Sequence, residues 1–420
     1  MDIKWSAIVG TRNTPHLIKS FVERWKKVVP NGEHYLIIVD SGIDLETKLM
    51  FNNHNLNNVY YHDVDPEFTL SDTYNYGVEK SLSNYISFLH NDIWLPEKYF
   101  DKLSESFEED KICISRRIEP IVFSQNTSNE IVKYIDCGSS WDTIDEGKIY
   151  TSMNEIPDFY GSHFFNFFIS FHKSLYEEVG GMDNLFDPMF CEDDDLHKRW
   201  DMLNKQYKLM GKVQFYHMPS QTSRYSDEYR YKTKIIEDIS NVNYFRKWGA
   251  KTGDNRIPKI KNSLFVKYNP DEFNNIMKFY EMFFSKVYFI VDNINIDAKE
   301  KIDKFIEENQ KYTQFDLSKR IFIITSKELK NKIGNDVSYY SIILKSKIDF
   351  ELLLELNDIV LSNNSMGLYK LDKDNILMIH KEINIENLIN SVQISIDDRI
   401  DYNTWKELKK QREWKKSLYD

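Results

Sequence analysis

The N-terminal quarter of the chain alternates short apolar runs with stretches whose apolar residues recur every three or four positions. The apolar runs predict β-strands at Ala7–Val9, Tyr35–Val39, Val59–Tyr61 and Tyr85–Leu89. The helical face between the first two runs consists of Leu17, Ile18, Phe21, Val22, Trp25 and Val29. Strands that alternate with helices are typical of a parallel sheet covered by helices, so we predict an α/β fold.

Ligands of such sheets usually bind beyond the carboxyl ends of the strands. The polar residues that directly follow a predicted strand are therefore the first candidates for a site. They are Thr11, Arg12, Asp40, Ser41, Asn91 and Asp92.

The middle of the chain, from about Arg116 to Gly253, is less periodic and contains an aromatic run over His163–Phe171. An acidic cluster follows. It precedes a predicted helix whose apolar stripe is Leu196, Trp200, Leu203 and Tyr207.

The polar and basic stretch Lys251–Asn262 predicts a domain boundary. Strand and helix patterns resume after it, with a helix over Ile296–Tyr312 that opens on Asp297 and Glu300 in capping-box spacing. Its predicted buried face is Ala298, Ile302, Phe305 and Ile306, and the predicted strands are Lys286–Val291, Arg320–Ile324, Asp358–Ser362 and Asn375–His380. We expect a first domain over residues 1–255, with a donor half to about 115, and a second, smaller α/β domain over 256–420.

A final helix is predicted over Thr404–Leu418, with Thr404 and Glu407 in capping-box spacing. It carries Lys406, Lys409, Lys410, Arg412, Lys415 and Lys416. Such a face suits solvent, and it also suits an anionic partner or a membrane surface. Acceptor positioning, formation of a homo-oligomer and a separate activity all remain open for the second domain.

Composition narrows the function classes. The chain has 420 residues, of which 41 % are hydrophobic and 29 % charged, which excludes global disorder. The net charge of −11 argues against a protein that binds nucleic acid through its phosphates. Three scattered cysteines support neither a disulfide framework nor a thiolate metal site. With no signal-peptide pattern and no membrane-length apolar run, we expect a soluble cytoplasmic protein.

The predicted strand that ends in His90-Asn91-Asp92 indicates a metal site. A divalent ion such as Mg²⁺ or Mn²⁺ that shares its ligand shell with substrate phosphates needs only one or two protein carboxylates. The alternative interpretation is that Asp92 caps a following helix.

Four consecutive acids, Glu192 to Asp195, stand at the start of the predicted helix. One or two of them are explained by the helix N-terminus. Carboxylates packed together raise one another's pKa, which suits a general base that deprotonates a hydroxyl. A calcium loop is the competing interpretation, but the alternating acids and central glycine of an EF-hand are missing.

Two further features complete the candidate chemistry. His217 follows an apolar strand and precedes a loop with Ser220, Ser223, Arg224, Arg230 and Lys232, the composition of a flap over a diphosphate. A structural histidine is the alternative. Asp40 suits a ribose hydroxyl or a base N–H, and equally a turn.

The order of these motifs resembles the inverting, GT-A-fold nucleotide-sugar glycosyltransferases of family two, over about Lys4–Gly249. The most specific match is Gly180-Gly181-Met182-Asp183 followed by Glu192-Asp193-x-Asp195-Leu196. Thr11 and Arg12 stand in the family's opening turn, and Tyr244–Gly249 at its frequent close. Asp72, with Asn75 and Gly77, resembles its Asn-x-Gly helix, and His90-Asn91-Asp92 stands in place of its Asp-x-Asp motif, with His90 and Asn91 departing from the earlier acids.

The resemblance implies a GT-A, Rossmann-like nucleotide-binding domain with a mixed central sheet. It implies transfer from a nucleotide-sugar, a UDP-sugar above all, to a hydroxyl of a glycan or glycoconjugate. Asp193 would be the catalytic base, with Glu192 as the second candidate, and Asp92 and His217 would bind Mn²⁺ or Mg²⁺. The nucleotide-sugar would contact Thr11, Arg12, Asp40, Asp72, Asn91, Gly181, Glu192 and Arg224, and we expect Trp141 to stack on the acceptor.

Two other functions stay open. A metal-dependent nucleotidyl or phosphoryl transferase would also use Asp92 and an acid cluster, although the sequence has no Walker-type loop. A catalytically degenerate scaffold would retain nucleotide binding alone.

Overall fold

The computed structural model describes residues 3–30, 32–52, 58–121, 127–161, 166–203, 205–219, 221, 223–224, 226–248, 251–253, 262–277, 284–292, 296–310, 317–336, 340–344, 367–371 and 376–380. Contacts divide the chain into unit 1, Met1–Glu237, and unit 2, Asp238–Asp420. The boundary predicted from the sequence, between residues 255 and 256, falls in a stretch of which 254–261 lie outside the described residues.

Unit 1 alternates strands and helices along its first half and is richer in strands along its second. Its elements are β1 (Trp5–Thr11), α1 (Pro15–Val28), β2 (Tyr35–Asp40), α2 (Leu45–Asn52), β3 (Val59–Asp63), α3 (Leu70–Glu79), β4 (Tyr85–His90), β5 (Ile93–Trp94), α4 (Tyr99–Ser106), β6 (Ile112–Glu119), β7 (Val132–Tyr134), α5 (Glu146–Ser152), β8 (Phe159–Gly161), β9 (Ile169–His172), α6 (Lys173–Glu178), α7 (Glu192–Met202) and β10 (Tyr207–His217). Helix α8 (Thr233–Trp248) spans the division between the units.

The strands of unit 1 form one mixed sheet in the order β3-β2-β1-β4-β9-β6-β10-β5, with β7 beside β6 and β8 beside β10. Strands β3, β2, β1 and β4 are parallel. Strand β9 is antiparallel to both of its neighbours, and β6 and β10 are parallel to each other. The predicted α/β class with a mixed central sheet is therefore confirmed.

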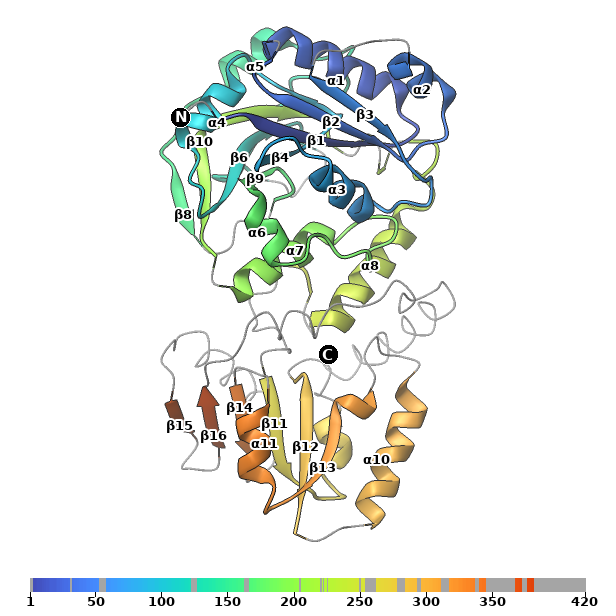
Figure 1. The fold of residues 1–420 in the computed structure, drawn as a ribbon, viewed down its shortest axis with the longest axis vertical. Helices are drawn as coiled ribbons and strands as arrows, with labels where there is room; N and C mark the ends of the chain where they lie inside the picture. Colours follow the sequence, from blue (N-terminus) through green and yellow to red (C-terminus); the bar gives the residue numbers. More distant parts are fainter. Residues whose placement is uncertain are drawn as a thin grey trace. The chain divides into compact units, whose positions relative to one another are not determined.

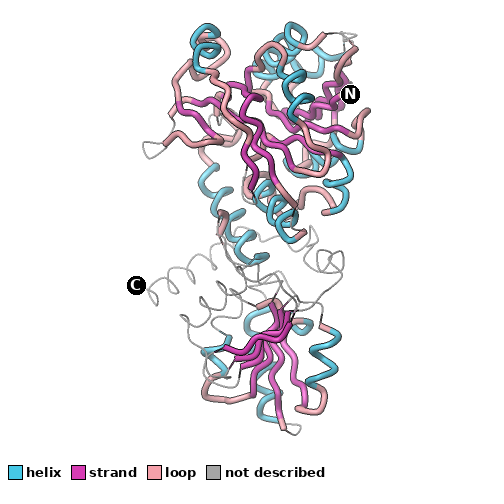
Figure 2. Tube along the Cα trace, turned by 90° about the vertical axis from the view of Figure 1, so that its left-hand side faces the viewer, coloured by secondary structure: helices cyan, strands magenta, loops and turns pink. Residues whose placement is uncertain are grey.

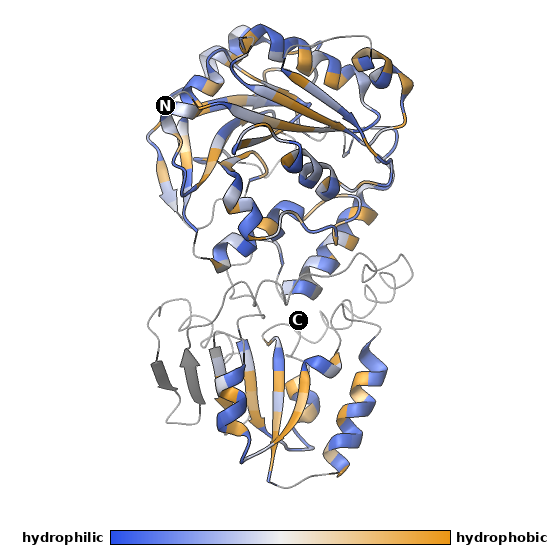
Figure 3. Cartoon of the chain, in the orientation of Figure 1, coloured by the Kyte–Doolittle hydropathy of each residue, from blue (hydrophilic) through white to orange (hydrophobic). Residues whose placement is uncertain are grey.

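The central strands β1 and β2 are mainly apolar, as expected for parallel strands that helices cover on both faces. Ala7, Ile8 and Val9 are buried, as is every residue from Leu36 to Val39. Helix α1 lies on one face and α3 on the other (Figure 1), and the turned view shows helices on both sides of the strands (Figure 2). Apolar residues gather in the strands, whereas the helices alternate apolar and polar positions (Figure 3).

Local sequence explains the two helices nearest the candidate site. Helix α1 begins at Pro15, whose fixed φ suits the first helical position, and buries the predicted stripe from Leu17 to Trp25. Helix α3 begins with a capping box, in which the Thr69 and Asp72 side chains each accept a backbone N–H of the other residue. The four predicted N-terminal strands and the helix between the first two are confirmed.

One predicted element is wrong. The helix that follows the acid run was expected to extend its stripe to Tyr207, but α7 ends at Met202. Tyr207 instead begins the eleven-residue strand β10, where its ring is buried and its hydroxyl donates a hydrogen bond to the carbonyl of His197. Pairing with β6 and β8 outweighs the helical spacing of this one aromatic residue.

Unit 2 has its own sheet, in the order β13-β12-β11-β14-β16-β15. Its described elements after α8 are β11 (Asn262–Lys267), β12 (Lys286–Val291), α10 (Ile296–Asn309), the 3-10 helix η3 (Leu317–Lys319), β13 (Ile321–Thr325), α11 (Leu329–Asn335), β14 (Tyr340–Leu344), β15 (Gly367–Leu371) and β16 (Ile376–His380). Strands β13, β12, β11 and β14 are parallel, and β16 and β15 add an antiparallel edge.

The predicted strands at Lys286, Arg320 and Asn375 correspond to β12, β13 and β16, and the predicted helix at Ile296 corresponds to α10. Ala298 and Ile302 are buried as expected, while Phe305 and Ile306 are half-buried. The predicted strand Asp358–Ser362, the basic helix Thr404–Leu418, Ser220, Gly249 and part of the aromatic run at 163–165 lie outside the described residues. Among the helices that are described, none has the length and apolar character needed to cross a membrane.

Candidate metal and donor site

The pairing of β5 with β10 brings together Asp92 and His217, which are far apart in the sequence of unit 1. Strand β4 ends at His90, and after a two-residue turn the chain forms β5, whose Ile93 pairs with His217 in antiparallel register. The backbone N–H of Met218 donates to the carbonyl of Asp92 at 2.9 Å. The turn that carries Asp92 is therefore fixed beside the carboxyl end of β10.

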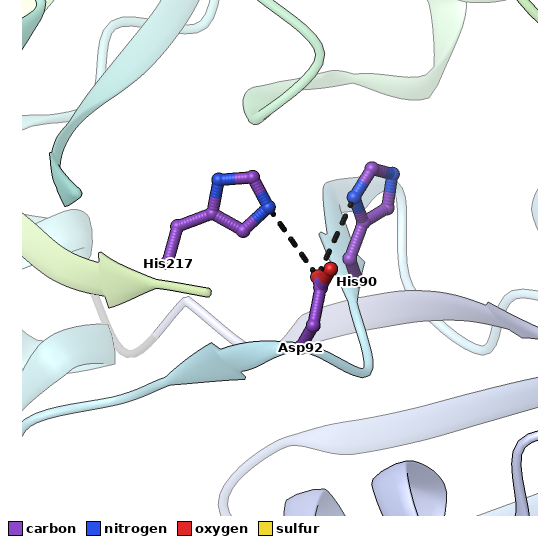
Figure 4. A group of neighbouring side chains, drawn as sticks. All are labelled: His90, Asp92 and His217. Atoms are coloured by element: carbon purple, nitrogen blue, oxygen red, sulfur yellow. Dashed lines mark ion pairs between the residues drawn. The ribbon is translucent and has the colours of Figure 1, made fainter. Parts of the chain in front are cut away.

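Three side chains converge on this point (Figure 4). Oδ1 of Asp92 lies 3.4 Å from Nε2 of His217 and 3.8 Å from Nδ1 of His90. One ligand atom from each residue lies within 4.8 Å of the others. Asp92 is buried, and its Oδ1 has no hydrogen-bond partner among the described residues. A buried carboxylate oxygen that accepts no hydrogen bond from the described residues and faces two imidazoles fits a divalent metal ion.

The surroundings of His90 and Asp92 lower the pKa of each side chain, for different reasons. Burial lowers the pKa of His90 to about 4, so its imidazole is neutral at pH 7 and keeps a free lone pair. The rings of Phe167 and Phe168 flank it, with centroids 4.2 and 4.9 Å away. Burial raises the pKa of Asp92, but the nearby charge of His217 outweighs burial and holds that pKa below its ordinary value.

Glu119 is a functional neighbour that the sequence reasoning missed. Oε1 of Glu119 lies 2.8 Å from Nδ1 of His217, on the side of the imidazole opposite Asp92. Burial lowers the pKa of His217, but the charge of Asp92 and the hydrogen bond with Glu119 outweigh it, and the pKa is raised to about 9. No pattern in the sequence singles out Glu119, because its place beside His217 depends on the pairing of β6 with β10.

The turn after β1 contributes hydroxyl and guanidinium groups at the carboxyl edge of the sheet. Nδ2 of Asn91 donates to the hydroxyls of Thr11 and Thr14 at 3.1 and 3.0 Å. Arg12 donates to the carbonyls of Ser41 and Pro66, so its guanidinium is held along the carboxyl edge of β1 and β2. Of the predicted donor residues, Thr11 and Asn91 therefore lie together next to Asp92, and Arg12 lies beside Ser41 at the end of β2.

Asp40 lies beside Thr11 in the parallel register of β1 and β2 and is fully buried. Its Oδ1 accepts the backbone N–H of Gly42 at 2.8 Å, and its Oδ2 accepts the hydroxyl of Tyr61 at 2.7 Å. Burial raises the pKa of Asp40 above its ordinary value. Each carboxylate oxygen of Asp40 already accepts one hydrogen bond within the protein, and each can accept one more.

The acid run divides into structural and available carboxylates. Asp195 is fully buried and pairs with Arg199 at 2.9 Å one helical turn later. Asp193 is half-buried, and its Oδ1 accepts the backbone N–H of Asp194. Glu192 is buried and its Oε2 has no hydrogen-bond partner among the described residues. Burial, and then the charge of Asp193, raise the pKa of Glu192 well above its ordinary value.

Helix α3 positions the glycine turn that precedes the acids. Asn75 donates from Nδ2 to the carbonyl of Met182 and accepts the Met182 N–H, both at 2.9 Å. Gly181 has φ +77°, and a Cβ there would lie 2.5 Å from Oδ1 of Asn75. Asp72 accepts Nδ2 of Asn184 at 2.7 Å in addition to its capping role. Asp72 and Gly181 thus lie together, with no described contact to Asp92.

Tyr74, from α3, joins the two halves of the site. It is fully buried between Phe88 and Phe167, and its hydroxyl donates to the carbonyl of Leu89 at 2.6 Å. Burial raises its pKa, and the charges of Asp92 and Glu192 raise it further. The Tyr74 hydroxyl is thus close enough to both Asp92 and Glu192 for their charges to affect its pKa.

Two predicted residues lie on the loops around the cluster. Trp141 is half-buried against a core cluster that includes Trp94 and Tyr216, and its indole N–H donates to the carbonyl of Asn91 at 3.3 Å. Nη2 of Arg224 lies 3.6 Å from Oε1 of Glu237. Gln221, on the same loop as Arg224, donates to the carbonyl of Ser139 at 2.9 Å. The loop after β10 therefore contacts the segment that carries Trp141.

No protein-family model matches the sequence, and no curated protein matches it. Solved structures with some similarity include S. aureus TarS residues 1–349 in complex with UDP-GlcNAc, at 13 % identity and TM-score 0.38, covering 58 % of this chain and 73 % of that one. The same protein in complex with UDP gives 15 % identity and TM-score 0.37, covering 57 % and 66 %. GalNAc-T7 with UDP, GalNAc and Mn²⁺ gives 11 % identity and TM-score 0.40, covering 58 % and 48 %.

Proposed function

We propose that the chain is an inverting glycosyltransferase with a GT-A-like first domain that transfers a sugar from a nucleotide-sugar, above all a UDP-sugar, to a hydroxyl of a glycan or glycoconjugate. The observation that carries the proposal is the convergence of His90, Asp92 and His217 at the carboxyl edge of a mixed α/β sheet. That edge is where α/β proteins bind nucleotides.

Donor binding is assigned to residues around this edge. Thr11 and Asn91 supply hydroxyl and amide groups beside Asp92, and Arg12 supplies a guanidinium beside Ser41. Asp40 would accept from the nucleoside, and Arg224 would pair with the diphosphate from the loop after β10. Asp72, Gly181 and Glu192 complete the predicted donor residues through α3 and the turn into α7.

The metal site would be formed by Asp92 and His217, with His90 as a third ligand. When bound, a divalent cation would neutralise charge on the leaving diphosphate. Two imidazoles beside one carboxylate suit Mn²⁺ better than Mg²⁺, because Mg²⁺ prefers oxygen ligands.

Asp193 is the proposed base. It would take the proton of the acceptor hydroxyl as that oxygen attacks the anomeric carbon. The bond from the anomeric carbon to the diphosphate oxygen breaks, and its electron pair leaves with the nucleoside diphosphate. Attack from the face opposite the leaving group inverts the configuration. Glu192 is the second candidate, since its buried carboxyl is less accessible to an acceptor hydroxyl than that of the half-buried Asp193.

The test is release of UDP from a panel of UDP-sugars with Mn²⁺, with water as the acceptor. Asp193→Asn is expected to lower the rate about 100-fold or more, with UDP affinity unchanged. The neighbouring Asp194→Asn is the matched control and should retain the rate. A near-normal rate in Asp193→Asn would eliminate its role, and a loss confined to Glu192→Gln would move the base to Glu192.

Other outcomes would favour the alternatives. Binding of UDP without turnover of any sugar nucleotide would indicate a degenerate scaffold. Metal-dependent cleavage between the phosphates of a nucleotide would indicate a nucleotidyl or phosphoryl transferase.

A further inference from the structure

The imidazole of His217 is held from both sides. Its Nε2 faces Asp92 at 3.4 Å, and its Nδ1 faces Oε1 of Glu119 at 2.8 Å. Glu119 is buried, so few water molecules compete for this contact. Two carboxylates therefore compete for one imidazole, and only the one on the Nε2 side belongs to the cluster with His90.

Strand register places Glu119 there. Strands β6 and β10 run parallel, with Arg117 beside Phe215 and Ile118 beside Tyr216. The next position in this register sets Glu119 beside His217. Arg117 and Glu119 are two residues apart and so project from the same face of β6.

Glu119 is itself fixed in place. Its Oε1 lies 2.7 Å from Nε of Arg117, and Nη1 of Arg117 donates to Oδ1 of Asn166 at 2.7 Å. The same Oδ1 accepts the backbone N–H of Phe168, whose ring packs against His217 with a centroid distance of 4.9 Å. A continuous chain of contacts thus runs from Asn166 through Arg117 and Glu119 to His217.

A carboxylate on Nδ1 determines which nitrogen of an imidazole carries the proton. The carboxylate accepts from Nδ1–H, which leaves the lone pair of Nε2 to face the other side of the ring. Partners of this kind orient metal-binding histidines and increase their basicity, and their loss typically costs 10- to 100-fold in metal affinity.

We propose that Glu119 is a positioning residue for the metal site: it holds His217 in the Nδ1–H tautomer and aims Nε2 at the ion bound by Asp92. This inference rests on the proposed metal site and adds to it a residue that does not touch the ion. Arg117 and Asn166 support Glu119 and have no contact with Asp92 among the described residues.

The experiment measures Mn²⁺ affinity of the full chain without nucleotide, from the electron paramagnetic resonance signal of free Mn²⁺. Glu119→Gln keeps the shape and an accepting oxygen but loses the charge, and should weaken binding about 10-fold. Glu119→Leu loses both and should weaken it by up to about 100-fold. Glu108→Gln is the matched control, because Glu108 pairs with Lys208 at the other end of β10 and should leave Mn²⁺ affinity unchanged.

A second measurement separates positioning from general support of the fold. Two-bond ¹H–¹⁵N spectra of histidine-labelled protein loaded with diamagnetic Zn²⁺ report the tautomer of each imidazole. In the wild type we expect Nε2 of His217 on the ion and the proton on Nδ1, and in Glu119→Leu a mixture of rings bound through Nε2 and through Nδ1. Melting temperatures of all variants are compared, since Glu108→Gln should lower stability without a change in tautomer.

The outcomes are distinct. Unchanged Mn²⁺ affinity and an unchanged tautomer in both Glu119 variants, with normal binding by the wild type, would overturn the role of Glu119 alone. A wild-type protein that binds Mn²⁺ no better than Asp92→Asn would overturn the metal site, and with it this inference. Weakened binding with a mixed tautomer supports the proposal.

Discussion

Nε of Arg12 lies 2.9 Å from Oε1 of Glu228, although 216 residues separate the two in the chain. Oε2 of the same glutamate accepts Nδ2 of Asn13 at 2.7 Å. The loop after β10 is thereby anchored to the turn that follows β1, where a nucleotide is expected. Glu228 thus forms an ion pair with the guanidinium of Arg12, the cation that the proposed donor would bind.

Glu228→Gln is expected to strengthen UDP binding. Arg12 and Glu228 are 25 % and 27 % exposed, and pairs of this kind contribute about 0.2 to 1 kcal/mol. Release of Arg12 should therefore raise UDP affinity by up to about fivefold in calorimetric titrations with Mn²⁺. Asp227→Asn, which removes the exposed partner of Arg230 on the same loop, is the control. Weaker UDP binding in Glu228→Gln would mean that Glu228 positions Arg12 instead of competing for it.

The preference of the proposed site for Mn²⁺ over Mg²⁺ should depend on the residue at position 90. His90→Asp replaces an imidazole with an oxygen ligand, which Mg²⁺ prefers. The ratio of Mg²⁺ to Mn²⁺ affinity should rise on the order of tenfold, measured by competition titration. His172→Asp is the control, because His172 also ends a strand of this sheet and caps a helix, a role that aspartate retains. An unchanged ratio would exclude His90 from the ligand set.

Gly181→Ala should destabilise unit 1. The left-handed φ of +77° disfavours any side chain, and the added Cβ would overlap Oδ1 of Asn75. We expect a loss of about 1 to 3 kcal/mol in the free energy of unfolding, measured with urea. Gly147→Ala, at an open position in α5, should be neutral or slightly stabilising. Equal stability of the two variants would contradict the close packing of α3 on this turn.

Acid should destabilise the fold through His34. Burial lowers the pKa of His34 to about 4, and Nδ1 accepts the backbone N–H of Trp5 at 3.3 Å, which requires the neutral ring. Between pH 6.5 and 4 the unfolded chain binds this proton and the folded protein does not. Stability from this group is therefore complete above pH 6.5 and falls as the pH is lowered to about 4, by about 3 kcal/mol at most.

The check is urea unfolding at a series of pH values. In His34→Asn the side-chain oxygen can replace Nδ1 as acceptor and does not titrate in this window, so the slope between pH 4 and 6.5 should decrease. His16→Asn, at an exposed position of α1, should keep the wild-type slope. An undiminished slope in His34→Asn would contradict the role of His34, because buried His90, whose pKa is also lowered to about 4, accounts for only part of the slope.

Sequence patterns predicted strands β1 to β4 because each contains a short, mainly apolar run bounded by polar residues. Sequence patterns failed where the pairing of strands that are far apart in the sequence determines the secondary structure. Strand β5 has only two residues, Ile93 and Trp94, and exists because β10 accepts it. Tyr207 fits a helical stripe equally well, and only its pairing with Ile112 assigns it to a strand.

The same distinction applies to the site. Asp92 and His217 could be selected from the sequence because each follows an apolar run with a polar change at its end. Glu119 could not, since its role depends on the parallel register between β6 and β10. The sequence likewise does not show which acids of the run Glu192 to Asp195 are structural, because the ion pair of Asp195 with Arg199 depends on the folded helix.

The central claim is that Asp92 and His217 create a metal-dependent nucleotide site. The most direct test is a thermal-shift panel of UDP, GDP, dTDP and CMP, each with and without Mn²⁺, on the wild type and Asp92→Asn. We predict that UDP with Mn²⁺ raises the melting temperature of the wild type, that UDP alone does so weakly, and that Asp92→Asn loses the metal effect. Stabilisation by no nucleotide, or an Mn²⁺ effect that persists in Asp92→Asn, would contradict the claim.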